Sequence, residues 1–212
     1  MIEVLSKKQL AVALSRLKGF EKPDFKLEQY QTESEIGAEI IWNIACRREI
    51  QGKTAADLGC GTGLLGIGLL LAGADKVYFV DIDDNAIETA KKNLEFIENE
   101  FDIELKDKAV FVVDKVENFN KKVEIVIENP PFGIQGKSHS DKEFLGKAMQ
   151  ISKLVYSFHK AESKGFINAF SRDNGFKTEG YWEFDWPLKQ TMKYHTKKIH
   201  YFKVGCWRLV KA

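Results

Sequence analysis

The chain has 212 residues, of which 44% are hydrophobic and 30% are charged, and its formal net charge is +1. These values are ordinary for a globular protein that can bury a full core, and they do not indicate a strongly basic nucleic-acid binder. Three scattered cysteines argue against a disulfide scaffold or a CxxC-type zinc site, and the longest apolar run, Leu64 to Ala72, is too short to span a membrane. Without a signal peptide, we expect a cytoplasmic protein.

Two helices are expected before residue 50. Residues 5–18 carry leucines at helical spacing. Thr32 and Glu35 have the spacing of a capping box, which predicts a second helix with isoleucines on one face. We expect residues 1–50 to form a helical extension that contributes to a ligand site within a single domain spanning residues 1–212.

From Lys53 onward, apolar strands alternate with helices. The expected strands cover residues 54–58, 76–80, 109–113, 123–127, 154–158, 175–186 and 199–210. The expected helices cover residues 64–72, 84–97, 141–151 and 163–174. This alternation predicts an α/β protein with a mostly parallel sheet that is covered by helices on both faces. The last two strands, expected to join around Pro187, predict an antiparallel hairpin at one edge.

The segment DLGCGTG, Asp57 to Gly63, stands where the first strand passes into a helix. Glycines there let a ligand approach the backbone closely, and the helix N-terminus offers free N–H groups. Asp81 ends the second strand, 20 residues after Gly61, where an acidic residue suits the hydroxyls of a ribose. Together these features predict a site for a nucleoside-bearing cofactor, although the glycines could also serve only a tight turn.

This half of the chain leaves open which nucleoside-bearing cofactor is bound. Gly61, Gly63 and Gly66 match the dinucleotide pattern GxGxxG, which alone is a weak signal. Asp57, directly before the loop, would repel a pyrophosphate but suits a cofactor that carries a cationic amine and a sulfonium. A dehydrogenase that binds NAD therefore remains an alternative, which a cofactor-binding measurement would separate.

Asn129-Pro130-Pro131-Phe132 follows the fourth strand. The prolines cannot continue a central strand, so this tetrapeptide is a stiff loop at the same sheet edge as the glycines. The Asn129 side-chain oxygen and the Pro130 carbonyl suit the two hydrogens of a planar NH₂ group, and Phe132 suits stacking on a base. The alternative is an ordinary strand terminator.

The last part of the chain is basic. No acidic residue follows Asp185. The basic residues of this tail are Lys189, Lys193, Lys197, Lys198, Lys203, Arg208 and Lys211. They alternate with aromatic residues, so the tail is either a solvated face or a surface for a polyanion, and the charge alone does not decide between these interpretations.

DLGCGTG followed by NPPF resembles S-adenosylmethionine-dependent methyltransferases that act on exocyclic amino groups. Four separated motifs look like the methyltransferase-like 5 family of rRNA adenine-N6 methyltransferases: Leu27-Glu28-Gln29-Tyr30-x-Thr32, Asn129-Pro-Pro-Phe-Gly133, Tyr156-Ser-x-His159-Lys160 and Tyr194-His195-x-Lys197-Lys198. The resemblance covers nearly the whole chain and departs at Gln31, where the family often has proline. It implies a Rossmann-like class I methyltransferase fold with a seven-stranded sheet.

The resemblance also implies roles for individual residues. The cofactor S-adenosylmethionine would be held by Gln29, Thr32, Asp57, Gly59, Gly61, Thr62, Gly63, Leu64, Asp81 and Asp114. The catalytic loop would consist of Asn129, Pro130, Pro131 and Phe132, and the RNA phosphates would be held by Lys160, Lys197 and Lys198. No metal is expected. Without the resemblance, Thr32 would be a helix cap, Asp114 the start of a loop and His159 a buried histidine.

The implied function is methyl transfer to the N6 amine of an adenine in RNA, above all small-subunit ribosomal RNA. Three alternatives remain: methylation of a protein glutamine amide, methylation of a DNA adenine, and RNA binding without catalysis by a retained cofactor fold. RNA is the expected partner, with no membrane. Eukaryotic members of this family work with a small zinc-containing activator protein, which makes such a protein a further candidate partner.

Overall fold

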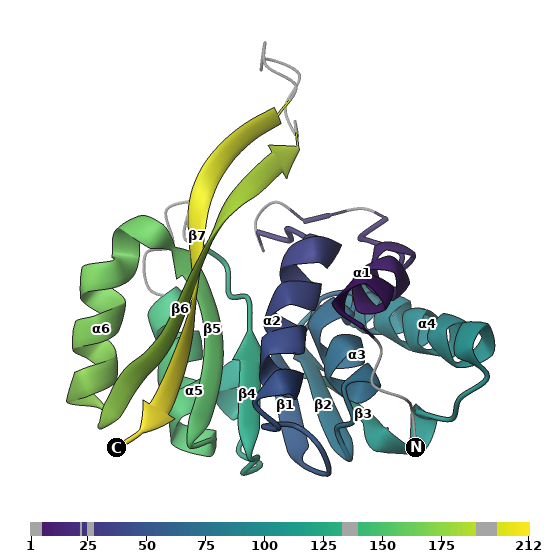
Figure 1. Ribbon diagram of the computed structural model, residues 1–212, viewed down its shortest axis with the longest axis horizontal. Helices are drawn as coiled ribbons and strands as arrows, with labels where there is room; N and C mark the ends of the chain where they lie inside the picture. The colour runs from purple at the N-terminus through teal and green to yellow at the C-terminus, as the bar shows by residue number, and fades with distance from the viewer. Residues whose placement is uncertain (1–5, 22, 25–27, 133–139, 190–198) are drawn as a thin grey trace.

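The structure, a computed structural model, describes residues 6–21, 23–24, 28–132, 140–189 and 199–212. Its strands are β1 (Thr54–Leu58), β2 (Lys76–Asp81), β3 (Ala109–Val113), β4 (Ile125–Glu128), β5 (Leu154–Lys160), β6 (Phe176–Lys189) and β7 (Ile199–Lys211). They form one seven-stranded sheet in the order β3-β2-β1-β4-β5-β7-β6 (Figure 1). Strands β1 to β5 are parallel, and β7 is antiparallel to both β5 and β6. The predicted α/β class, with its antiparallel C-terminal hairpin, is confirmed.

The helices cover both faces of this sheet. They are α1 (Lys7–Ser15), α2 (Ser34–Cys46), α3 (Leu64–Leu71), α4 (Asp84–Phe101), α5 (Ser140–Ile151) and α6 (Lys164–Asp173). Because successive strand residues point to opposite faces, Ala55 packs in the core under α1 to α4, whereas Ala56 packs in the core under α5 and α6. No helix in the described part of the chain combines the length and apolar character needed to cross a membrane.

The structure corrects two local expectations. Helix α2 begins at Ser34 with Glu33 as its N-cap and without a side-chain cap, so the capping box predicted at Thr32 is wrong. The Thr32 hydroxyl instead accepts a hydrogen bond from a residue 97 positions away. Pro187 lies inside β6 and not in the connection between the last two strands. A proline is tolerated there because β6 is an edge strand.

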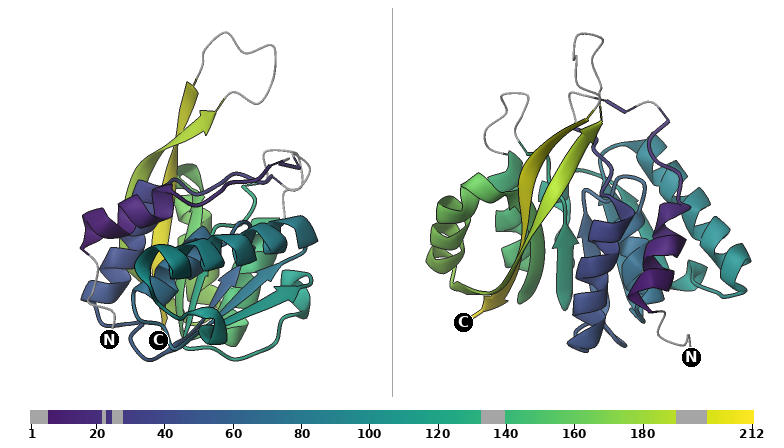
Figure 2. Two further views of the ribbon diagram at one scale, coloured as in Figure 1. Left: turned by 90° about the vertical axis from the view of Figure 1, so that its right-hand side faces the viewer. Right: turned by 45° about the horizontal axis from the view of Figure 1, so that its top comes forward.

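The connection between α1 and α2 passes over the carboxyl ends of the parallel strands (Figures 1 and 2). The loops that follow β1, β2, β3 and β4 open at the same edge, because these strands are parallel to one another. Ligand sites of such sheets lie outside the carboxyl ends of the strands, so this edge is where the predicted site residues should meet.

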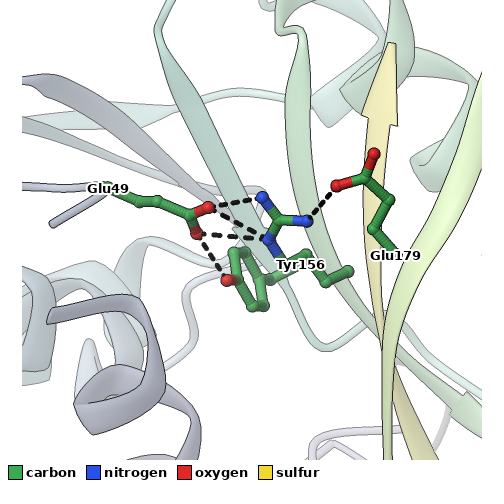
Figure 3. Close-up of polar contacts among 4 residues, drawn as sticks. Glu49, Tyr156 and Glu179 are labelled. Atoms are coloured by element: carbon green, nitrogen blue, oxygen red, sulfur yellow. Dashed lines mark hydrogen bonds and ion pairs between the residues drawn. The ribbon is translucent and has the colours of Figure 1, made fainter. Parts of the chain in front are cut away.

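A partly buried ionic cluster joins the end of α2 to the C-terminal hairpin (Figure 3). The guanidinium of Arg208 on β7 donates to Glu49, which follows α2, and its Nη1 donates to Glu179 Oε2 at 2.8 Å. The Tyr156 hydroxyl on β5 donates to the same Glu49 carboxylate at 2.6 Å. Burial, together with the Glu49 carboxylate, holds the pKa of Tyr156 above its usual range. The Glu49 carboxylate thus connects the end of α2 with both β5 and β7.

Replacing Arg208 by Met should lower the free energy of unfolding by about 3 kcal/mol, because a partly buried Glu49 would lose its cation. Urea unfolding followed by circular dichroism measures this change. The control is Lys203→Met, which removes the pair between Lys203 and Asp185, whose side chains are 56% and 63% exposed. That variant should change stability little, and an equal loss in both variants would contradict the role of the partly buried cluster.

Candidate active site

A cavity of about 270 Å³ opens at the carboxyl edge of the sheet. Its walls come from five parts of the chain: the N-terminal connection, the glycine loop after β1, the end of β2, the loop after β3, and the loop after β4 with the start of α5. Small-molecule sites are concave and are lined mostly by apolar groups with a few placed polar ones. The position and the mixed lining of this cavity fit a nucleoside-bearing ligand.

Most of the predicted site residues meet in this cavity. Its lining includes Gln29, Thr32, Asp57, Gly59, Gly61, Thr62, Leu64, Asp81, Asn129 and Pro131. Gly63 is the N-cap of α3. Asp114, Pro130 and Phe132 do not line the cavity, and Lys160 ends β5. Lys197 and Lys198 lie outside the described residues.

The glycine loop lies under two aromatic rings. Gly59 and Gly61 have φ angles of +67° and +51°, which favour glycine. A Cβ atom at Gly59 would lie 2.8 Å from the Phe144 ring, and one at Gly61 would lie 2.8 Å from the Phe20 ring. The loop therefore needs glycine both for its backbone conformation and for the close approach of these rings.

Two carboxyl groups, one buried and one partly buried, organise the floor of the cavity. Asp57 is 1% exposed and accepts a hydrogen bond from the Gly66 N–H at 2.7 Å. Burial raises the pKa of Asp57 to about 7, and the nearby Asp81 carboxylate adds to the rise. Asp81 accepts from the Gly61 N–H at 2.8 Å and from the Asp83 N–H at 2.9 Å. Burial also raises the pKa of Asp81. These bonds fix the glycine loop to the end of β2.

The cavity carries more acidic than basic side chains. Glu28, Asp57, Asp81, Glu117 and Glu143 line it, and among the described residues only Lys115 brings a cation. Such a site disfavours the two negative charges of a dinucleotide pyrophosphate and favours a ligand with cationic groups. The lining thus supports S-adenosylmethionine over NAD, the alternative left open by the GxGxxG pattern.

Gln29 is held in place from both sides of its amide. Its Nε2 donates to Asp83 Oδ2 at 2.7 Å, and its Oε1 accepts from the Asp24 N–H at 2.7 Å. The N-terminal connection is thereby attached to the start of α4, next to Asp81. A residue far upstream of the glycine loop thus becomes part of the same wall.

The amide of Asn129 is oriented by Thr32. Asn129 Nδ2 donates to Thr32 Oγ1 at 3.0 Å, whereas Asn129 Oδ1 is buried without a partner among the described residues. Leaving a buried acceptor unpaired costs about 1–3 kcal/mol, so such an atom needs a donor, which a water, an ion or a ligand can supply. The free oxygen is therefore available to an incoming N–H donor at the wall of the cavity.

Phe132 and Asp114 lie elsewhere than expected. The Phe132 ring is 7% exposed and packs edge-on against Trp186 and Phe202 of the hairpin, with centroid distances of 6.0 and 5.6 Å. It anchors the loop and does not face the cavity. Asp114 accepts from Asn118 Nδ2 at 2.7 Å, and this turn brings residues 115–117 to the cavity.

The comparisons with known proteins agree with this geometry. A family model described as the methyltransferase small domain matches residues 31–153. The rRNA N(6)-adenosine-methyltransferase METTL5 of Danio rerio is 34% identical over 194 residues, which cover 90% of this chain and 92% of the relative. The chain belongs to the METTL5 family. Its relative in Drosophila melanogaster is 30% identical over 96% of both chains.

Solved structures show the same fold as this METTL5 family member. A protein of Pyrococcus horikoshii, described as a candidate RNA methyltransferase, superposes with a TM-score of 0.86 at 39% identity over 97% of this chain and 96% of that chain. A protein of Thermoplasma acidophilum superposes with a TM-score of 0.75 at 26% identity over 97% of both chains. The predictions of a methyltransferase enzyme, of a Rossmann-like fold and of S-adenosylmethionine as cofactor are confirmed.

Several wall residues had no signal in the sequence. Phe20 and Phe144 line the cavity, as do Lys115 and Glu117. Aromatic residues in a connection or at a helix start resemble core residues, and no periodicity distinguishes the two. In the loop after the third strand, the resemblance points to Asp114, whereas the cavity is lined there by residues 115–117.

Replacing Thr32 by Val should lower kcat for methyl transfer about fivefold, because the Asn129 amide would lose one hydrogen bond of about 1 kcal/mol and rotate more freely. Steady-state kinetics checks this expectation. The control is Thr89→Val, which removes the exposed hydroxyl of a threonine that donates only within α4. If kcat of Thr32→Val matches that of the control, Thr32 does not orient the amide.

The raised pKa of Asp57 predicts a pH-dependent stability. A carboxyl whose folded-state pKa lies near 7, above its ordinary 3.8, contributes stability at low pH that is lost as the pH rises through about 7. The loss from this group is up to about 4 kcal/mol. Asp57→Asn removes this pH-dependent contribution. The unfolding free energy of the variant should therefore fall less between pH 5 and pH 8 than that of the unchanged protein.

Urea unfolding at several pH values measures this difference. The control is Asp75→Asn at an exposed position, whose pH profile should follow that of the unchanged protein. Parallel profiles for Asp57→Asn and the unchanged protein would show that Asp57 titrates normally.

Proposed function

We propose that this protein transfers a methyl group from S-adenosylmethionine to the N6 amine of an adenine in RNA, above all small-subunit ribosomal RNA. The observation that carries the proposal is the buried Asn129 oxygen, which has no partner among the described residues and belongs to an amide whose nitrogen is held by Thr32. An exocyclic amine brings the N–H donors that this oxygen lacks. The rRNA N(6)-adenosine-methyltransferases among the relatives favour adenine in RNA over a DNA adenine or a protein amide.

The residues proposed to hold the cofactor surround the cavity. Gln29 and Thr32 would contact it from the N-terminal segment. The glycine loop would hold its amino-acid end, Asp81 its ribose, and the loop after Asp114 its adenine. When bound, S-adenosylmethionine supplies a methyl group that is activated by its sulfonium. The acidic lining of the cavity would stabilise the cationic groups of this ligand. We also propose that residues 1–50 belong to the same domain as the sheet, since they carry two of these contacts.

The catalytic loop would act by positioning the N6 amine of the substrate. Asn129 Oδ1 and the Pro130 carbonyl would accept the two N6 hydrogens and turn the nitrogen lone pair toward the methyl donor. Pro130 and Pro131 restrict the backbone, so these acceptors need little reorganisation when the amine arrives. Phe132, packed against Trp186, would keep the loop fixed to the hairpin.

Basic residues would hold the RNA phosphates. Lys160 ends β5, with 27% of its side chain exposed. Lys197 and Lys198, outside the described residues, are proposed to contact phosphates together with it. Only an unpaired or extruded adenine could reach the Asn129 loop, because a stacked and paired base hides its amine. We propose that the protein works in the cytoplasm and that a small zinc-containing activator protein is its second partner.

The test is methyl transfer from labelled S-adenosylmethionine to ribosomal RNA that lacks the modification, followed by nucleoside mass spectrometry. We expect N6-methyladenosine, and we expect Asn129→Ala to lower kcat about 100-fold, because the amine would lose an oriented acceptor. The control is Asn174→Ala, which replaces an exposed asparagine that bonds within α6. Cofactor binding is measured in parallel by calorimetry.

Three outcomes would contradict parts of the proposal. Full activity of Asn129→Ala would remove the role of the loop. A methylated glutamine in place of methylated RNA would change the substrate class. Full activity that does not change when a zinc-containing activator protein is added would remove the proposed second partner.

A further inference from the structure

A row of buried polar side chains lies next to the catalytic loop. Glu128 is the last residue of β4 and directly precedes Asn129. In the parallel register Glu128 pairs with Ser157 of β5, and His159 follows two positions later, on the same side of that strand. Glu128 and Ser157 are 0% exposed and His159 is 1% exposed. Such groups are costly to bury, so their presence needs an explanation.

The three side chains form a continuous chain of contacts. Ser157 Oγ lies 2.7 Å from Glu128 Oε1 and 2.7 Å from His159 Nε2. At the far end, His159 Nδ1 lies 3.9 Å from Asp141 Oδ2 at the start of α5. Neither Glu128 Oε2 nor His159 Nδ1 has a hydrogen-bond partner within the described part of the chain.

The charged groups around Glu128 come from three elements. Asp57 of β1 and Asp141 of α5 act on it electrostatically, and His159 of β5 ends the contact chain. On the next strand, β7 places the uncharged indole ring of Trp207 opposite Ser157 and 5.8 Å from the His159 ring. Within the described residues, the surroundings of Glu128 are therefore acidic, apart from the imidazole.

The two hydrogen bonds of this chain of contacts can each be donated in either direction, depending on the protonation state of Glu128. When Glu128 carries a proton, its O–H donates to Ser157 Oγ, the Ser157 O–H donates to His159 Nε2, and the ring proton sits on Nδ1, which faces the Asp141 carboxylate. When Glu128 is ionised, both bonds reverse, and a lone pair of Nδ1 faces that carboxylate. The first direction is favoured electrostatically, because it places an N–H group opposite a negative charge.

Burial also favours the state in which Glu128 carries a proton. It raises the pKa of Glu128 to about 8; the Ser157 hydrogen bond opposes this rise, and the charges of Asp141 and Asp57 add to it. Burial also lowers the pKa of His159 to about 3, so its ring is neutral at physiological pH. Near neutral pH the chain of contacts therefore contains a protonated carboxyl, a hydroxyl and a neutral imidazole.

We propose that Glu128, Ser157 and His159 are positioning residues that hold Asn129 in its reactive place, and that they do so while Glu128 carries a proton. The inference rests on the proposed function, because Asn129 is the residue proposed to receive the adenine amine. An ionised Glu128 would add a third carboxylate charge beside Asp57 and Asp141 in a buried site. That charge draws the end of β4, and Asn129 with it, toward solvent.

The first test is the pH profile of kcat for the unchanged protein and for Glu128→Gln. The glutamine N–H₂ group donates to Ser157 as a protonated carboxyl does, but it does not ionise. We expect kcat of the unchanged protein to fall about tenfold between pH 7 and pH 9, and kcat of Glu128→Gln to fall less than about twofold. The control is Glu95→Gln at an exposed position of α4, which should follow the unchanged protein. An alkaline fall of equal size in all three would overturn the proposal.

A second variant separates positioning from folding. Ser157→Ala cuts the contact chain but leaves the cofactor cavity intact, since Ser157 does not line it. We expect a lower kcat with an unchanged dissociation constant for S-adenosylmethionine, measured by calorimetry. An unchanged kcat in a folded Ser157→Ala protein would overturn the proposal.

The third test does not depend on activity. Nitrogen NMR of the imidazoles reports which ring nitrogen carries the proton, and His159→Gln identifies the His159 signal among the four histidines. We expect the proton on Nδ1 at pH 7 and on Nε2 above about pH 8, with Glu128→Gln remaining in the Nδ1–H form. A proton on Nε2 at pH 7 would overturn the proposal. Absence of methyl transfer at every pH, together with the expected tautomers, would instead contradict the proposed function.

Discussion

The hydrogen bond between Asn129 Nδ2 and Thr32 Oγ1 is the interaction on which the arrangement of the site depends. It joins two segments that are 97 residues apart in the sequence. One is the stiff loop after β4, and the other is the N-terminal connection that passes over the sheet edge (Figure 2). Because the amide nitrogen is occupied, the oxygen is the atom left for a ligand. A single bond thus fixes both the closing wall of the cavity and the orientation of the Asn129 amide.

The stability of this edge comes from groups that are not themselves part of the cavity. Phe132 packs into the aromatic cluster of the hairpin, and Arg208 ties that hairpin to the end of α2 through Glu49 (Figure 3). Helix α2 begins shortly after Thr32, at Ser34. The hairpin therefore supports the Asn129 end of this hydrogen bond, and the N-terminal helices support the Thr32 end. Both parts contribute to the geometry of the site.

Much of the fold could be predicted because its signals are local. The alternation of apolar strands with amphipathic helices determines an α/β sheet, and DLGCGTG marks the turn at which a ligand approaches the backbone. Gln29 and Thr32 have no such local signal, and only the family resemblance of their motif assigns them to the cofactor site. The glycine positions required no such help, because the positive φ angles of Gly59, Gly61 and Gly63 belong to the turn itself.

What the sequence did not reveal depends on contacts between distant residues. Thr32 looked like a helix cap because Glu35 follows at the right spacing, but the competing partner Asn129 lies on another element. Phe132 looked like a stacking ring, but the apolar hairpin buries it. The pairing of Glu128 with Ser157 appears only once β4 and β5 are placed in register. Burial and long-range pairing thus override local preference at these positions.

The proline inside β6 has a consequence for the behaviour of the protein at high concentration. An outer strand normally presents a row of N–H groups to which the edge of a second molecule can add. Strand β6 has 14 residues, long enough to serve as such a template, but Pro187 has no N–H to offer. Lys177, Glu179, Glu183 and Asp185 place charges at intervals along the same strand. The longest free edge of the sheet is thereby a poor seed for aggregation.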